Sequence, residues 1–109
     1  MNKLVALRLS SFLFASIFSV SAIAEISIPK LDNAQVFAEF NDELPAVANY
    51  FTPSSQEEIV SFYKRQYGEV VQLDDKYGRL TYHFANNSQK IRIAISTQGE
   101  VQEVDIFIE

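Results

Sequence analysis

The chain has 109 residues and no cysteine, with nine bases against fourteen acids for a formal net charge of −5. A chain of this length has room for one hydrophobic core, and without cysteine it is held together by packing alone. The acidic balance argues against binding to nucleic acid, which needs a basic face to neutralise phosphates, and against docking on anionic lipid.

The first 24 residues have the features of a secretory signal peptide. Lys3 and Arg8 form a short basic start, residues 9–23 are uncharged and mostly apolar, and Ala22 and Ala24 are the small residues at −3 and −1 of a cleavage site. The apolar stretch is shorter than the roughly 20 residues that span a bilayer, which disfavours a retained membrane anchor. We expect cleavage after Ala24 and a periplasmic or secreted protein.

The mature chain is then expected to be a single domain over residues 25–109. No cysteine follows the cleavage site to carry a lipid anchor. Loss of Lys3 and Arg8 leaves seven bases against fourteen acids, a net charge of −7. A net charge of this sign favours a basic protein partner, although acidity also simply keeps exported proteins soluble.

Two short apolar segments precede the most patterned part of the chain. Ala34–Phe40 and Ala46–Thr52 flank the turn-forming residues Asn41-Asp42-Glu43, and the first segment alternates apolar and polar residues toward its end. This pattern favours a β-hairpin. A short helix over residues 33–40 is the alternative that the sequence leaves open.

Residues 56–67 are predicted to form the one main helix. Ser55 is a helix-capping residue, and Glu58 three positions later completes a capping box. Gly68 can adopt the left-handed conformation that ends a helix. The apolar residues with the i, i+3, i+4, i+8 spacing of one helix face are Ile59, Phe62, Tyr63 and Tyr67. An aromatic stripe at this spacing is typical of a helix that packs on a core.

After Gly68 the hydrophobic period changes from that of a helix to that of a strand. A short apolar segment, Val70–Leu73, is followed by a turn predicted over Asp74–Gly78. Three alternating strands come next, separated by turns at Asn86-Asn87-Ser88 and Gln98-Gly99-Glu100. Their apolar residues are Leu80, Tyr82 and Phe84, then Ile91, Ile93 and Ile95, then Val104, Ile106 and Ile108. This pattern predicts an antiparallel meander with one apolar face.

Together these elements predict an α+β fold of two layers, in which the main helix packs on the antiparallel β-meander, with an N-terminal β-hairpin before it. The stretches YFTPSSQEEIVSFYKRQYG and VDIFIE resemble small bacterial envelope proteins and lipoprotein modules, in which a helix of this pattern precedes a meander. IPKLDNAQV is similar to the segment that leads into such modules. The resemblance implies the fold and no particular activity.

Residues suited to catalysis or metal binding are sparse. His83 is the only histidine, no G-x-S-x-G motif presents a serine, and sites built on two histidines or cysteines are excluded. Glu57 and Glu58 suit the helix N-terminus, while Asp74-Asp75 lacks the spaced oxygen ligands of a calcium loop. Asn86-Asn87-Ser88 matches a glycosylation triplet but is more simply a turn. We therefore predict no catalytic residue, no cofactor and no metal.

The polar face of the meander is the candidate binding surface. Its bases lie on two neighbouring strands and its acids on the next, which cross-strand pairing alone can explain. The same face can also dock a partner around an exposed aromatic anchor. The residues predicted to contact such a partner are Arg79, Thr81, His83, Arg92, Asp105 and Phe107.

Two non-catalytic functions fit this chain. The first is an acidic exported protein that binds another envelope or exported protein, as an inhibitor, an immunity protein or an accessory subunit. The second is a carrier or sensor for a small ligand, in a pocket between helix and sheet lined by Tyr63, Tyr67, Tyr82 and Phe84. A homodimer through an exposed strand edge is compatible with both. An enzyme that uses carboxylates is a third class, with no motif to support it.

Overall fold

The computed structural model describes residues 25–109, so the predicted signal peptide over residues 1–24 lies outside the described residues. The described chain contains one helix, α2 (Gln56–Tyr67). Its strands are β1 (Gln35–Phe40), β2 (Ala46–Thr52), β3 (Gln72–Lys76), β4 (Arg79–Asn86), β5 (Gln89–Gln98) and β6 (Val101–Ile108).

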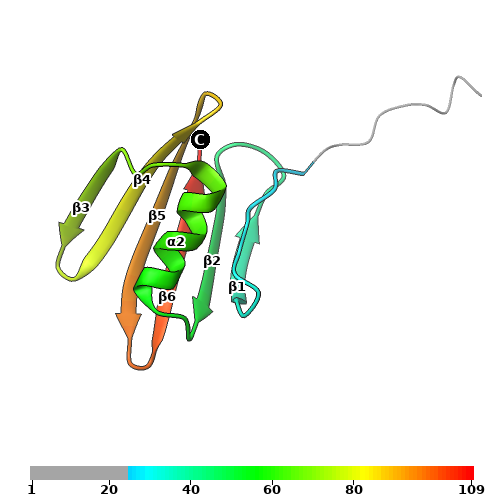
Figure 1. The fold of residues 1–109 in the computed structure, drawn as a ribbon. Coiled ribbons are helices and arrows are strands. Elements are labelled where there is room, and N and C mark those ends of the chain that lie inside the picture. Colours follow the sequence, from blue (N-terminus) through cyan, green and yellow to red (C-terminus); the bar gives the residue numbers. More distant parts are fainter. Residues whose placement is uncertain (1–24) are drawn as a thin grey trace, which may run out of the picture.

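All six strands form one antiparallel sheet in the order β1-β2-β6-β5-β4-β3. The β1–β2 hairpin and the meander from β3 to β6 therefore belong to the same sheet, joined where β2 pairs with β6. Between β2 and β3 the chain passes over one face of the sheet as α2 and re-enters at the β3 edge (Figure 1). No helix of the described chain covers the opposite face.

The predicted α+β class is wrong. The structure is a six-stranded antiparallel sheet with a single twelve-residue helix, so it is much richer in strand than a two-layer fold built on a main helix. Two features enlarge the sheet: the N-terminal hairpin joins it through β6, and β3 includes Asp74–Lys76, where the sequence predicts a turn. The helix is too short to cover six strands, and Ile26, Ile28 and Leu31 also pack against the core.

The connection between β3 and β4 is tighter than the predicted turn over Asp74–Gly78. Tyr77 and Gly78 have φ angles of 55° and 80°, the left-handed values required at both central residues of a type I′ hairpin turn. Such a turn matches the twist of the flanking strands, so pairing extends from Lys76 and Arg79 to Gln72 and His83. The turn thus needs only two residues, and the aspartates remain in the strand.

The N-terminal hairpin and the helix have the predicted bounds within two residues. β1 pairs with β2, so the helical alternative for residues 33–40 is wrong. At the start of α2 the Ser55 hydroxyl accepts from the Glu58 N–H at 3.1 Å, and the Glu58 carboxylate accepts from the Ser55 N–H at 2.9 Å. The capping box is therefore complete, and Gly68 ends the helix with a φ of 93°.

The core lies between α2 and the sheet face that α2 covers. Ile59 and Tyr63 of the helix are fully buried there. The sheet contributes Ala46, Ala48, Tyr50, Phe84, Ile91, Ile93, Ile95, Val104, Ile106 and Ile108. A chain of hydrogen bonds also ties the N-terminal segment to this core, since the Tyr63 hydroxyl donates to the Pro29 carbonyl at 2.8 Å and contacts the Tyr50 hydroxyl at 2.9 Å.

Candidate functional site

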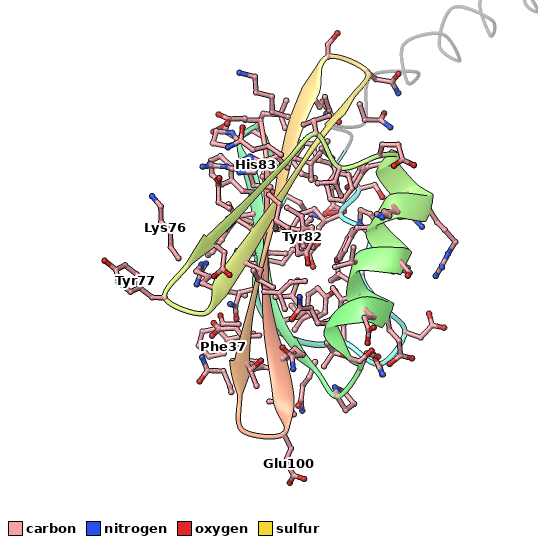
Figure 2. All side chains as sticks on the ribbon, turned by 60° about the vertical axis from the view of Figure 1, so that its left-hand side comes forward. Phe37, Lys76, Tyr77, Tyr82, His83 and Glu100 are labelled. Atoms are coloured by element: carbon pink, nitrogen blue, oxygen red, sulfur yellow. The ribbon has the colours of Figure 1, made fainter. Side chains whose placement is uncertain are left out.

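The sheet face turned away from α2, here named the open face, holds the candidate site. Successive strand residues point to opposite faces, so the residues that alternate with the core lie on it. The strand register arranges them in rows that cross the sheet from β1 to β4. One row contains Phe40, Val47, Phe107, Arg92 and His83, and the next contains Ala38, Asn49, Asp105, Ala94 and Thr81. In Figure 2, His83 and Phe37 lie on this side and Tyr82 lies toward the helix.

A depression of about 500 Å³ runs along the second row, and we name it the open-face depression. Its base is low because Ala38 and Ala94 each project only a methyl group. The larger side chains of Phe40, Phe107 and Arg92 stand on one side. The complete lining is Ala38, Phe40, Val47, Ala48, Asn49, Arg79, Thr81, Arg92, Ala94, Asp105, Ile106 and Phe107.

Arg79 lies across this depression and pairs with an acid two strands away. Its Nη2 is 2.7 Å from Oδ2 of Asp105 across the intervening strand β5, on which Ala94 is in register with Asp105. The other carboxylate oxygen of Asp105 accepts from the Asn49 amide at 2.6 Å, and the same amide donates to Glu103 at 2.8 Å. Both oxygens of Asp105 are therefore hydrogen-bonded within the protein.

Arg92 is held differently from Arg79. It pairs in register with Phe107, and its guanidinium carbon lies 4.2 Å from the centre of the Phe107 ring, which is a cation–π arrangement. The nearest carboxylate, Glu109, is 3.9 Å away, beyond hydrogen-bond distance. Stacking thus fixes the position of the guanidinium, while its N–H groups have no hydrogen-bonded carboxylate among residues 25–109.

His83 of β4 does not line the depression and contacts the edge strand β3. Its Nε2 lies 2.9 Å from Oδ2 of Asp74, which also accepts from the Gln72 amide. The hydrogen bonds from Gln72 and His83 hold the pKa of Asp74 below its usual range. Of the residues predicted to contact a partner, Arg79, Thr81, Arg92, Asp105 and Phe107 line the depression, whereas His83 does not.

Several residues of the depression come from the N-terminal hairpin and were not predicted. Phe40 and Ala38 of β1 and Asn49 of β2 join it because β2 pairs with β6. Phe37 sits at the β-bulge between Val36 and Ala38 and is 79% exposed, while Phe40 is 68% exposed. Alternation in the hairpin indicates which side chains share a face. It does not indicate which strand of the meander the hairpin joins.

The space between helix and sheet, proposed from sequence as a ligand pocket, is filled by side chains. Around Val60, Tyr63, Tyr82 and Phe84 no room is left for a water molecule. Tyr63 stacks parallel to Tyr67 with ring centres 6.2 Å apart, and the Gln56 amide donates to the Tyr82 hydroxyl at 3.1 Å. These aromatics pack the core and leave no cavity at this position.

Chemically, the open-face depression offers guanidinium donors, aromatic faces and methyl groups. Within the part of the chain that the structure describes, no three histidine, aspartate or glutamate side chains are placed to hold a metal ion together. The helix within residues 25–109 is not long and apolar enough to span a membrane.

No protein-family model, curated protein or solved structure matches the chain.

Proposed function

We propose that the chain is a small exported protein that acts without catalysis, by binding another envelope or exported protein through its open face. The observation that supports this most is the contrast between the two sheet faces. One face is covered by α2 and the N-terminal segment, whereas the other carries a depression bordered by Phe40, Phe107 and Arg92. Aromatic and arginine side chains in a concave surface are the residues that most often carry the energy of protein–protein binding.

The exposed aromatic residues extend this surface beyond the depression. Phe37 and Phe40 lie on β1, an edge strand, and are largely exposed. Solitary exposed apolar residues are ordinary, but neighbouring ones beside a depression mark a contact surface. An inhibitor, an immunity protein or an accessory subunit is the class of protein that this surface fits.

The proposal is tested by capture of a partner from envelope extract of the native host with the tagged full chain. Three variants are compared with the wild type: F40A, R92Q and the control R65Q, which removes an exposed arginine from α2. We expect one stoichiometric partner with wild type and R65Q, and at least tenfold weaker capture with F40A and R92Q. Circular dichroism confirms that each variant is folded. Equal capture by all four proteins would remove the open face from the proposal.

A further inference from the structure

The hydrogen-bonding groups of the open-face depression are unevenly satisfied. What we infer from this about the partner rests on the function proposed above. The acidic groups are used internally, since Asp105 accepts from both Arg79 and Asn49, and Asn49 also donates to Glu103. A partner therefore finds few free acceptors here.

The basic groups have capacity to spare. Arg79 uses one nitrogen, Nη2, on Asp105, and its side chain is 49% exposed. Arg92 lies on the Phe107 ring and has no hydrogen-bonded carboxylate within residues 25–109. A guanidinium has five N–H donors in a planar fork that matches a carboxylate, so both arginines can bind one from outside. Because the ring already positions Arg92, little side-chain freedom is lost when it does so.

The apolar groups lie beside these donors. Phe40 is mostly exposed at the β1 end, and the methyl groups of Ala38 and Ala94 form the base between Phe40 and the arginines. A bound group that pairs with the arginines and also contacts the apolar side chains thus needs a carboxylate and an apolar group next to each other.

The charge distribution favours the same occupant. Four of the seven lysines and arginines in residues 25–109 lie on the open face, namely Lys76, Arg79, Lys90 and Arg92. Four of the fourteen acids, Asp74, Glu103, Asp105 and Glu109, also lie on or border this face, so its formal charges balance. The rest of residues 25–109 carries ten acids against three bases, so an acidic group of a partner is repelled less on the open face than elsewhere.

We infer that the partner protein inserts an aspartate or glutamate side chain, flanked by an apolar side chain, into the open-face depression. The carboxylate binds Arg92 and the free donors of Arg79, and the apolar side chain contacts Phe40 and the two alanines. The paired Arg79 and Asp105 orient the site, and Arg92 supplies the main contact.

The test uses 3-phenylpropionate, which carries a carboxylate and a ring, and its uncharged analogue 3-phenylpropionamide. Each is titrated into the ¹⁵N-labelled full chain while backbone amide shifts are recorded. We expect the carboxylate to shift the amides of Ala38, Asn49, Ala94 and Phe107, with saturation in the millimolar range of a small fragment. The amide and the variant R92Q should each weaken binding at least tenfold, while R65Q should bind as the wild type does.

Five outcomes would overturn the inference. Equal binding of the amide, or unchanged binding by R92Q, would show that no carboxylate is recognised. Saturation at micromolar concentration would identify a small-molecule site instead of a docking surface. If the captured partner depends on Phe40 but not on Arg92, the proposed function stands and this inference fails. If no captured partner depends on the open face, both fail.

Discussion

Arg79 reaches Asp105 across a whole intervening strand, with 2.7 Å between Nη2 and Oδ2 although β5 separates β4 from β6. Ala94, the β5 residue in register with Asp105, has only a methyl group, which leaves room for the arginine side chain to cross β5. Ala94 is 8% exposed although it lies on the open face. The small side chain of Ala94, in the middle of the sheet, thus makes the depression deeper and leaves space for the Arg79–Asp105 ion pair.

Replacement of Ala94 by leucine is expected to fill the depression and displace Arg79 from Asp105. Capture of the partner should fall at least tenfold, which corresponds to about 1.4 kcal/mol of binding free energy. The free energy of unfolding should change by about 1 kcal/mol or less, because a solvent-exposed ion pair contributes little. Quantitative capture and urea denaturation measure the two effects.

The matched control is A85L, which adds the same side chain to an exposed open-face position on β4 that does not line the depression. It should leave capture unchanged. If A85L and A94L weaken capture equally, the effect is general to the face and the depression has no special role.

Local signals in the sequence predict the elements well and their assembly poorly. The capping box of Ser55 and Glu58 defines α2, and the period-two alternation defines β4, β5 and β6, because these patterns depend on neighbours in the chain. The β2–β6 pairing joins residues 50 or more positions apart and leaves no local trace. The hairpin half of the candidate site was missed for this reason, and so was part of the extent of the sheet.

The β3 strand shows a second limit of the same kind. Asp74 and Asp75 have low strand propensity and suggest a turn. In the structure Asp74 accepts hydrogen bonds from Gln72 and contacts His83 on the neighbouring strand, so a cross-strand contact offsets the propensity. Such contacts become visible only when the register is known.

The hydroxyl of Tyr63 is expected to stabilise the fold through its two hydrogen bonds. It donates to the Pro29 carbonyl in a partly buried position and contacts the Tyr50 hydroxyl in a buried one. Y63F removes these bonds and leaves buried groups without a partner, which costs roughly 1–3 kcal/mol. Urea denaturation of Y63F should show this loss in the free energy of unfolding.

Tyr67 provides the opposite case on the same helix. Its hydroxyl is buried and has no hydrogen-bond partner within the described chain. Y67F removes a desolvated polar atom and keeps the ring stacked on Tyr63, so stability should stay the same or rise. If Y63F and Y67F lower the free energy of unfolding equally, the hydrogen bonds of Tyr63 do not explain its contribution.

The capping box makes a separate contribution to stability. S55A removes the acceptor of the Glu58 N–H and should destabilise the protein by about 0.5–2 kcal/mol, the usual effect of losing a helix N-cap. S61A, at an exposed position inside α2, is the matched control and should be neutral or slightly stabilising because alanine favours helix. Thermal denaturation of both variants separates loss of the cap from a general effect of serine replacement.

Stability should decrease at alkaline pH because of the buried tyrosines. Burial raises the pKa of Tyr50 and Tyr63, and raises the pKa of Tyr67 to about 12. In the unfolded chain tyrosine loses its proton near pH 10. Above that pH the unfolded state binds fewer protons than the folded state, so the free energy of unfolding falls as pH rises. The stabilisation from Tyr67 is complete below about pH 10 and is lost as pH rises toward about 12.

Urea denaturation between pH 8 and 11 tests this pH dependence. Y67F should lose less stability over this interval than the wild type, because one of the raised pKa values is removed. Y77F is the control for loss of a tyrosine hydroxyl outside the core, since Tyr77 is fully exposed at the β3–β4 turn. The other titratable groups are common to all three proteins, so only the difference in slope is interpreted. Identical slopes for wild type and Y67F would mean that Tyr67 ionises as readily in the folded protein as in the unfolded chain.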